Sequence, residues 1–380
     1  MIEALFFIVF GLIVYTYFGY PCLLTLASLF FKIEIKKLET YPSVSMVIAA
    51  YNEEKYIARK ITNSLSLDYP KDKLEIIVTS DCSSDKTNSI VESFTGRNVR
   101  LLVSQTRKGK TAGRNMSVPQ AKGEIIVFSD ATGLYEPDAL KKLIRNFNDE
   151  RVGCVGGLLR YVNPSNSMVG SGEGLYWKYE VMIKEKESLL GNLTSVSGSI
   201  YAFRKKLYNT IPEELADDLI VPLIIKKSGY YVILEPEAIC AEETTKEGKE
   251  EASKRARIAN RNIMGLIFMK ELFNFFKYGF FSLELLSHKV LRLLMPFLLI
   301  SLFIVNQLLI FKSLFYALCA LAQIAFYVSA ISGYLIQKKS GKKNRFLYVS
   351  LFFCLSNLSV FFGIVKFLAG QKKVTWETVR

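Results

Sequence analysis

The sequence is poor in histidine, since His288 is the only one in 380 residues. A metal site built from several histidines is therefore excluded. The cysteines show no Cys-x-x-Cys pair and no metal-ligand spacing, which is typical of reduced, mostly structural thiols in a protein that faces the cytoplasm. They are Cys22, Cys82, Cys154, Cys240, Cys319 and Cys354. General acid–base chemistry, if the chain performs any, must fall mainly to carboxylates.

A Walker A loop is missing as well. The segment 107–115, Arg-Lys-Gly-Lys-Thr-Ala-Gly-Arg-Asn, contains glycines and lysines whose spacing does not match that loop. It forms instead a basic, glycine-containing entry to a helix, which suits an anionic ligand. The alternative is a solvated run of charge without a ligand.

Charge is absent from residues 4–31, a run longer than the ~20 residues that cross a bilayer. The run is too long for a signal peptide and lacks a basic leader and a small-residue cleavage site. We expect a retained transmembrane helix there, and three more at 290–311, 314–336 and 346–369. The segment 262–289 mixes apolar and charged residues, which favours helices in the membrane interface. A helix packed on the domain core is the alternative.

Basic residues give the chain a net charge of +14. They gather beside the apolar runs, at 32–37 and 338–345, and the positive-inside rule places both clusters, with the region between them, in the cytoplasm. Four spans then leave the basic tail outside, so either the tail is an exception or one apolar segment is re-entrant. Because the charges flank the spans, we expect a lipid bilayer as partner and no nucleic acid.

The region between the spans alternates strands with helices. Strands are predicted at 44–50, 74–79, 99–104 and 124–129, with helices ending near residue 65 and spanning 84–94 and 110–121. This alternation predicts a parallel, doubly wound sheet. From residue 152 onward the alternation loosens, as in a mixed sheet, and a helix is expected at 168–190.

Polar clusters follow three of these strands, at 51–54, 81–85 and 129–132. Each alone is a common helix cap or turn. Together they are expected along the sheet edge where open α/β sheets bind nucleotides. Asp130 is the candidate there to hold a metal ion and, through it, a phosphate.

Taken together, these stretches resemble the family 2 inverting glycosyltransferases. The likeness is closest to the membrane-bound branch that includes cellulose, chitin, hyaluronan and poly-N-acetylglucosamine synthases, and it covers residues 15–261 and 287–296. The resemblance implies an α/β GT-A fold, which is Rossmann-like with a mixed, mostly parallel sheet, joined to transmembrane α-helices. It implies a nucleotide-sugar donor, most often UDP-linked, a saccharide or lipid-linked acceptor, and Mg²⁺ or Mn²⁺ as cofactor.

The domain organisation follows from the spans and the resemblance. An N-terminal transmembrane helix (1–31) precedes a GT-A domain at 32–261, whose donor half covers about 40–150 and whose acceptor half covers about 151–261. Interfacial helices (262–289) and a C-terminal transmembrane region with a short tail (290–380) complete it.

The resemblance also implies a role for particular residues of the donor site. Three would hold the nucleotide base, a fourth the uracil or ribose, and two more would line the donor pocket. In that order they are Ala50, Tyr51 and Glu53; Asp81; and Lys110 and Asn115. Asp130 matches the first carboxylate of the D-x-D metal motif, so it would hold the metal ion.

The acidic pair Asp217-Asp218 matches the family's catalytic motif. Asp217 would contact the donor and Asp218 would be the catalytic base. Pro222 indicates that Asp218 lies just before a helix, whose dipole would favour the ionised form. Ser197-Gly198 and the strand that follows, to Arg204, would form a floor near the acceptor.

Residues 254–258 match the Q-x-x-R-W-like helix motif, in which Arg255 and Arg257 would lie near the donor diphosphate or the acceptor. Two departures stand out. Thr132 replaces the second D-x-D carboxylate, so that ligand would be a hydroxyl, a water or absent. Lys254 and Ile258 replace the motif's glutamine and tryptophan, which weakens the case for a processive enzyme.

Three further hypotheses remain open. Trp177, in the helix at 168–190, is either a platform for an acceptor sugar or a core residue, and Trp376 is an expected membrane-interface anchor. Asn306, Gln323 and Asn357 would line a polymer channel in a processive synthase, whereas a single-addition enzyme would meet a lipid-linked acceptor. A non-catalytic, decayed transferase is the alternative from another class, and Thr132 is its only support.

Overall fold

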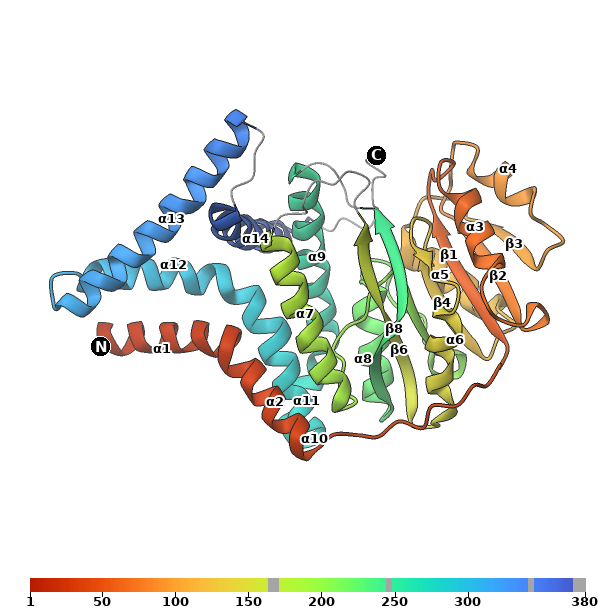
Figure 1. Cartoon of the computed structure of the whole chain (residues 1–380), viewed down its shortest axis with the longest axis horizontal. Helices are drawn as coiled ribbons and strands as arrows, with labels where there is room; N and C mark the ends of the chain where they lie inside the picture. Colours follow the sequence, from red (N-terminus) through yellow and green to blue (C-terminus); the bar gives the residue numbers. More distant parts are fainter. Residues whose placement is uncertain (163–170, 244–247, 341–344, 372–380) are drawn as a thin grey trace.

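The computed structural model describes residues 1–162, 171–243, 248–340 and 345–371. The expected interface anchor Trp376 and the basic tail residues Lys372, Lys373 and Arg380 lie outside these ranges. An eight-stranded sheet and a group of long apolar helices make up the two ends of the molecule (Figure 1).

The sheet has the strand order β3-β2-β1-β4-β7-β6-β8-β5. Its first half is parallel and consists of β1 (Val44–Ala50), β2 (Leu74–Ser80), β3 (Val99–Val103) and β4 (Ile125–Asp130). The connecting helices are α3 (Ile57–Leu65), α4 (Thr87–Glu92), α5 (Lys110–Gln120) and, after β4, α6 (Ala139–Ile144). The predicted alternation of parallel strands and helices is confirmed, although α4 is shorter than expected because the chain before Thr87 forms a polar turn.

The second half of the sheet is mixed. It contains β5 (Leu134–Tyr135), β6 (Val152–Val162), β7 (Ile200–Arg204) and β8 (Tyr231–Glu243), with β7 antiparallel to both β4 and β6. The helices of this half are α7 (Ser171–Leu189), α8 (Asp217–Lys227) and α9 (Gly248–Phe268). This arrangement is the GT-A fold.

Alternate residues of the central strands enter two separate cores. In β4, Val127 belongs to the core under α3 and α6, whereas Ile126 and Phe128 belong to the core under α8 and α9. Both faces of a parallel sheet are covered by helices, so its strands are apolar on each side. The two cores fix β1 and β4 and thereby hold the strand ends in place.

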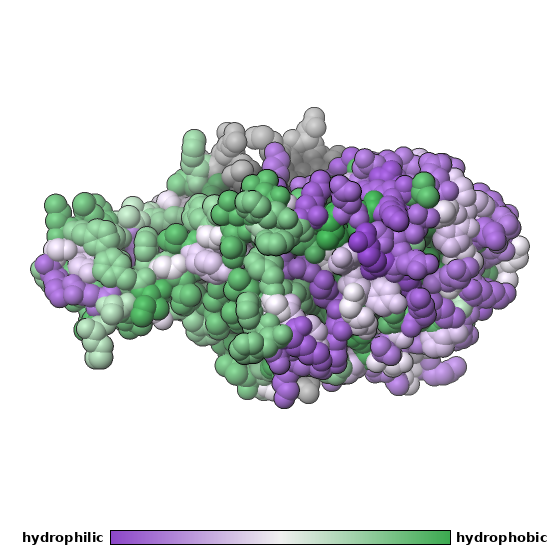
Figure 2. Space-filling model, turned by 90° about the horizontal axis from the view of Figure 1, so that it is seen from below, coloured by the Kyte–Doolittle hydropathy of each residue, from purple (hydrophilic) through white to green (hydrophobic). Residues whose placement is uncertain are grey.

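Within the described residues, four helices are long and apolar enough to cross a membrane: Ile2–Phe30, Phe280–Leu309, Leu314–Lys339 and Phe346–Leu368. They contain α1 (Ile2–Val14) and α2 (Tyr20–Phe30); α11 (Phe280–Leu285) and α12 (Leu291–Leu309); α13 (Leu314–Ser340); and α14 (Arg345–Leu368). Their apolar surface contrasts with the polar surface over the sheet (Figure 2). The second of these helices begins at Phe280, ten residues before the predicted start at 290.

The segment predicted to lie in the membrane interface is divided in the structure. Met264, Met269 and Leu272 are buried in the core under α8 and α9, which matches the alternative of a helix packed on the domain. Phe275 and Phe276, in α10 (Phe275–Tyr278), are instead 57% and 102% exposed. This short turn, together with Ile267 and Phe268 at the end of α9, presents large apolar side chains outward in the manner expected of an interfacial segment.

The three polar side chains proposed for a polymer channel bond to one another or to the backbone. The amides of Asn306 and Gln323 pair at 3.0 Å between α12 and α13. Asn357 donates to the carbonyl of Phe353 at 2.9 Å, one turn earlier in α14. These contacts satisfy hydrogen-bonding groups of the side chains that would line the channel of a processive synthase.

Candidate functional site

Three strand ends meet at one edge of the sheet. Ala50 pairs with Ser80 and Ala49 pairs with Asp130, so β1, β2 and β4 end side by side. The turns after β1 and β2 are tied together, because Asn52 accepts the amide of Ser84 at 2.9 Å. This juxtaposition brings the three predicted polar clusters to one edge.

The predicted base-binding residues lie on this edge. Ala50 and Glu53 are buried, and the amide of Glu53 donates to the hydroxyl of Thr87 at 2.8 Å. The guanidinium of Arg107 lies over the ring of Tyr51, 3.8 Å from its centre. Tyr51 and Arg107 therefore form a flat, cationic rim beside the strand ends.

Asp81 orders the basic loop that leads into α5. Its two carboxylate oxygens accept the amides of Lys108 and Gly109 at 2.8 and 2.9 Å. Gly109 has φ of +96°, a conformation that favours glycine. Asp81 is predicted to contact the nucleotide, and it also has a structural role. Its carboxylate fixes the position from which Lys110 starts the helix.

Asp130 is surrounded by cations at the end of β4. Lys110 forms an ion pair with it, and a guanidinium nitrogen of Arg114 lies 3.5 Å from the same carboxylate oxygen. Burial would raise the pKa of Asp130, but Lys110 and Arg114 outweigh it and lower that pKa below its ordinary value. Asp130 is therefore held ionised.

Arg114 links the two acidic clusters of the site, which are Asp130 on one side and the pair Asp217-Asp218 on the other. It is fully buried, forms an ion pair with Asp217 and donates to the carbonyl of Gly198 at 3.0 Å. The hydroxyl of Tyr201 also donates to Asp217, at 2.7 Å. Burial would raise the pKa of Asp217, but the charge of Arg114 outweighs it and lowers that pKa.

Asp218 differs from its neighbour in having no side-chain hydrogen bond among the described residues. Burial first, and then the negative charge of Asp217, raise the pKa of Asp218, against the opposing charges of Lys110, Arg261 and Arg114. Asp218 lies in the first turn of α8, and Pro222 lies within that helix. The prediction that Asp218 lies just before the helix is therefore wrong, because the helix begins at Asp217 and Pro222 lies inside it instead of marking its start.

Gly198 separates the two acidic clusters. A methyl group at this position would come within 3.0 Å of the Lys110 ammonium and 3.3 Å of an Asp218 carboxylate oxygen. The close approach leaves Lys110 and Asp218 facing one narrow gap, and a glycine keeps it open.

We expect Gly198→Ala to lower turnover by up to about 100-fold, because a displacement of ~1 Å at a reacting group can cost that much. Initial rates of sugar transfer measure the effect. Gly11→Ala is the matched control, since a methyl group there would have nothing within 4 Å. Equal rates for the two variants would contradict the importance of this gap.

The two arginines of the helix motif have different surroundings. The guanidinium of Arg255 lies over the ring of Phe352 in α14, 4.8 Å from its centre, and so packs against the apolar helices. Arg257 is partly buried, and the charges of Asp130 and Asp218 act on its guanidinium. Arg257 is thus electrostatically coupled to Asp130 and Asp218.

Asn115 holds a loop. Its amide nitrogen donates to the carbonyl of Ile211 at 2.7 Å, and its oxygen accepts the hydroxyl of Tyr208 at 2.7 Å. The donor-pocket role implied for Asn115 finds no support in these contacts, which join α5 to the segment before α8.

Three residues of the site received no role from the sequence, Arg114, Glu242 and Arg261, and Ser199 was expected only as part of the acceptor floor. Arg114 lies one helical turn after Lys110, and this four-residue spacing is a signal that indicates it. Arg261 lies one turn after Arg257 and donates to the hydroxyl of Thr111 at 3.0 Å. Ser199 and Glu242 give no such signal, because 43 residues separate them in the chain.

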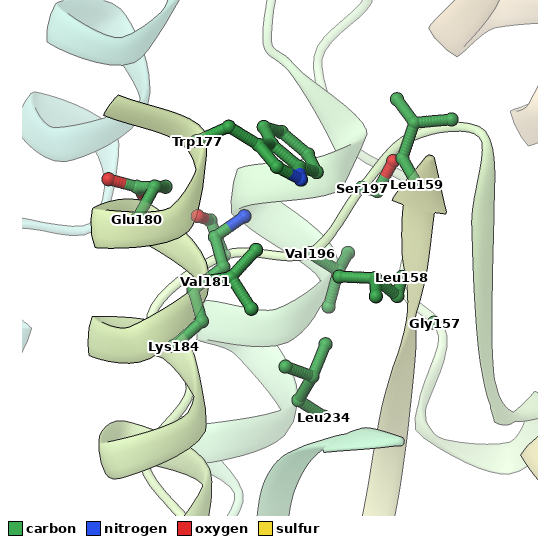
Figure 3. Close-up of a pocket in the computed structure, with 11 residues that line it drawn as sticks. Gly157, Leu158, Leu159, Trp177, Glu180, Val181, Lys184, Val196, Ser197 and Leu234 are labelled. Carbon is green, nitrogen blue, oxygen red and sulfur yellow. The ribbon is translucent and has the colours of Figure 1, made fainter. Parts of the chain in front are cut away.

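A small pocket adjoins the site on the side of α7 (Figure 3). Trp177 and Lys184 of α7 face Leu158 of β6 across it, and Ser197 lines it next to Gly198. The ring of Trp177 packs against that of Tyr161, with 5.5 Å between their centres. Trp177 is thus partly a core residue, and it also lines a pocket that includes Ser197, the residue before Gly198.

Comparison with known proteins identifies the domain. The model of the family described as glycosyl transferase family 2 matches residues 45–211. These residues form a family 2 glycosyl transferase domain. The match includes β1, β4 and the site residues from Ala50 to Ser199.

Curated relatives of this domain carry matching names. A probable glycosyltransferase, YdaM, of Bacillus subtilis is 27% identical over 264 residues, or 64% of this chain and 60% of its own. A poly-beta-1,6-N-acetyl-D-glucosamine synthase of Staphylococcus aureus is 28% identical over 215 residues, or 55% of this chain and 51% of its own. The chain thus spans about half to three fifths of the length of these relatives.

A solved structure resembles nearly the whole chain. The mannosyltransferase PcManGT from Pyrobaculum calidifontis, in complex with GDP-Man and Mn²⁺, superposes with a TM-score of 0.71 and 23% identity. The likeness covers 98% of this chain and 100% of that one. The family 2 domain and the helices around it therefore share one fold with that protein.

Proposed function

We propose that this chain transfers a sugar from a nucleotide-sugar donor to a saccharide or lipid-linked acceptor, with inversion at the anomeric carbon. The observation that carries the proposal is the contrast between Asp130 and Asp218 on either side of Gly198. Lys110 and Arg114 hold the first ionised, whereas burial and Asp217 raise the pKa of the second. An ionised carboxylate beside basic groups suits a cation and a diphosphate, and a carboxylate with a raised pKa suits a general base.

The donor is proposed to lie along the edge formed by β1, β2 and β4. Tyr51 and Arg107 would cover the base, and the Asp81 loop would border the ribose. Lys110 and Arg257 supply positive charge where a diphosphate leaving group develops negative charge. PcManGT, which binds GDP-Man, supports a nucleotide sugar as the donor class, and we favour a UDP-linked sugar.

A divalent cation fits the donor atoms near Asp130. The second oxygen of that carboxylate lies 3.1 Å from the hydroxyl of Ser199, and such hard oxygen ligands suit Mg²⁺ or Mn²⁺. When bound, the ion would neutralise charge on the leaving diphosphate. The Mn²⁺ in the PcManGT complex supports this cofactor class.

The chemistry proposed for Asp218 is general base catalysis. Its carboxylate would accept the proton of the acceptor hydroxyl while that oxygen bonds to the anomeric carbon. The bond from this carbon to the diphosphate oxygen breaks in the same displacement. A raised pKa suits the role, because a base works best when its pKa approaches the working pH.

The acceptor is proposed to enter from the membrane side. The pocket walled by Trp177 and Ser197 is lined by α7, which contacts the apolar helices α2 and α14, and Ser197 is the residue before Gly198. The basic residues beside the spans favour a cytoplasmic position for the catalytic domain. The Staphylococcus polysaccharide synthase supports a growing polymer as acceptor, whereas the paired Asn306 and Gln323 favour addition to a lipid-linked acceptor.

A donor screen tests this function. The full chain in lipid nanodiscs, supplied with Mn²⁺ and membrane lipid extract, is incubated with labelled UDP- and GDP-sugars. We expect transfer of label from one donor class, with UDP-sugars preferred, and product length separates repeated from single addition. Absence of both transfer and donor hydrolysis with every donor, with either Mg²⁺ or Mn²⁺, would contradict the proposal and favour a non-catalytic transferase.

A further inference from the structure

Thr132 occupies the position where the D-x-D motif has its second carboxylate, and the structure brings another carboxylate to it. The hydroxyl of Thr132 donates to Glu242, near the end of β8, at 2.8 Å. The two residues are 110 positions apart in the chain. The hydroxyl that replaces the motif's carboxylate is therefore in direct contact with the carboxylate of Glu242.

A second contact extends this pair to Asp130. The Ser199 hydroxyl lies 3.2 Å from one oxygen of Glu242 and 3.1 Å from the second oxygen of Asp130. Two carboxylates and two hydroxyls thus form a continuous series: Asp130, Ser199, Glu242 and Thr132. All four side chains offer oxygen atoms to one small volume.

Strand pairing explains why Glu242 arrives there. The short strand β5 follows the turn after Asp130 and pairs with β8, Leu134 opposite Ala241 and Tyr135 opposite Cys240. In this antiparallel register the next residue of β8, Glu242, comes beside the turn. Gly133 allows the approach, since a methyl group there would lie 2.6 Å from the sulfur of Cys240.

A buried lysine fixes the same turn. Lys60 of α3 is fully buried and donates to the carbonyl of Gly133 at 2.6 Å. The neighbouring Glu243 has a different environment, because it forms an ion pair with Arg59 at 3.4 Å and its side chain is 56% exposed. Of the two adjacent glutamates, only Glu242 is directed to the oxygen cluster.

We propose that Glu242 supplies the second carboxylate ligand of a divalent cation, in place of the missing D-x-D carboxylate at Thr132. The inference rests on the proposed function, because it concerns the cation of that same site. Glu242 and Asp130 provide the charge, and the hydroxyls of Ser199 and Thr132 connect them. Hard oxygen ligands of this kind select Mg²⁺ or Mn²⁺ over soft metals.

Direct binding of Mn²⁺ tests the assignment without any need for turnover. The full chain in nanodiscs is titrated with Mn²⁺, with and without UDP, and free Mn²⁺ is followed by its electron paramagnetic resonance signal. We expect Glu242→Gln to weaken Mn²⁺ binding at least about tenfold, since even groups around metal ligands typically contribute ~10–100-fold. Glu243→Gln is the matched control and should bind as wild type does.

Restoring the motif provides the decisive variant. Thr132→Asp combined with Glu242→Gln returns the second carboxylate to its D-x-D position and should recover Mn²⁺ binding to within about threefold of wild type, which a misfolded Glu242→Gln protein could not explain. Equal Mn²⁺ binding by Glu242→Gln and Glu243→Gln, or no recovery in the double variant, would overturn the proposal. Sugar transfer by wild type that persists in EDTA would overturn the cation site while leaving the proposed function intact.

Discussion

Replacing Asp218 by asparagine is expected to lower kcat for sugar transfer by ~10²–10⁴-fold, the usual contribution of a general base. Asparagine has nearly the same shape but cannot accept the proton of the acceptor hydroxyl. The carboxylate has no hydrogen bond within the described part of the chain, so its loss should leave folding unchanged. Single-turnover rates at saturating donor measure the effect.

The pH dependence gives an independent check on Asp218. Burial and the charge of Asp217 raise its pKa above the ordinary ~3.9 of aspartate. Only the ionised form accepts a proton, so activity should be lost as the pH falls through this raised pKa. We expect the acidic limb of kcat/KM at a higher pH than an ordinary aspartate would give. Glu237→Gln, which removes an exposed partner of Arg145, should change neither the limb nor kcat; an unchanged kcat in Asp218→Asn would contradict the assignment.

Replacing Arg114 by methionine is expected to destabilise the domain by about 3–5 kcal/mol, the usual cost of leaving a buried charge without its partner. Arg114 is fully buried, and its loss leaves Asp217 beside Tyr201 without its ion-pair partner. Thermal unfolding of the full chain in nanodiscs measures the change.

A second variant and a control isolate this ion pair. Adding Asp217→Asn to Arg114→Met removes the stranded charge, so the double variant should lose less stability than the sum of the single variants. Arg160→Gln breaks the more exposed pair with Glu136 and should cost less than ~1 kcal/mol. Additive losses in the double variant would show that Arg114 and Asp217 are not coupled.

Local pattern was sufficient to predict the donor half of the fold. The run from Val44 to Ala50 is apolar except for Ser45 and becomes β1 with the predicted limits, because a central parallel strand is buried on both faces. The polar residues after each strand were placed at one edge for the same reason: parallel strands end on the same side of a sheet. The GT-A fold was thus predictable from spacing and resemblance together.

Contacts between distant segments were not predictable in this way. The approach of Glu242 to Thr132 depends on the pairing of β5 with β8, and β5 has only two residues, too few to leave a pattern. Asn115 and Arg255 do match motif positions, but their contacts were not predictable either. A motif position fixes a residue type and not its surroundings. Asn115 holds a loop and Arg255 packs on Phe352, in contacts that only the folded chain reveals.

The anomeric configuration of the new glycosidic bond tests the central claim most directly. The full chain in nanodiscs transfers sugar from an α-linked nucleotide donor, and NMR of the isolated product gives the configuration. Direct displacement assisted by Asp218 predicts a β-linked product. An α-linked product would contradict the account, because retention requires a mechanism other than single displacement with Asp218 as base.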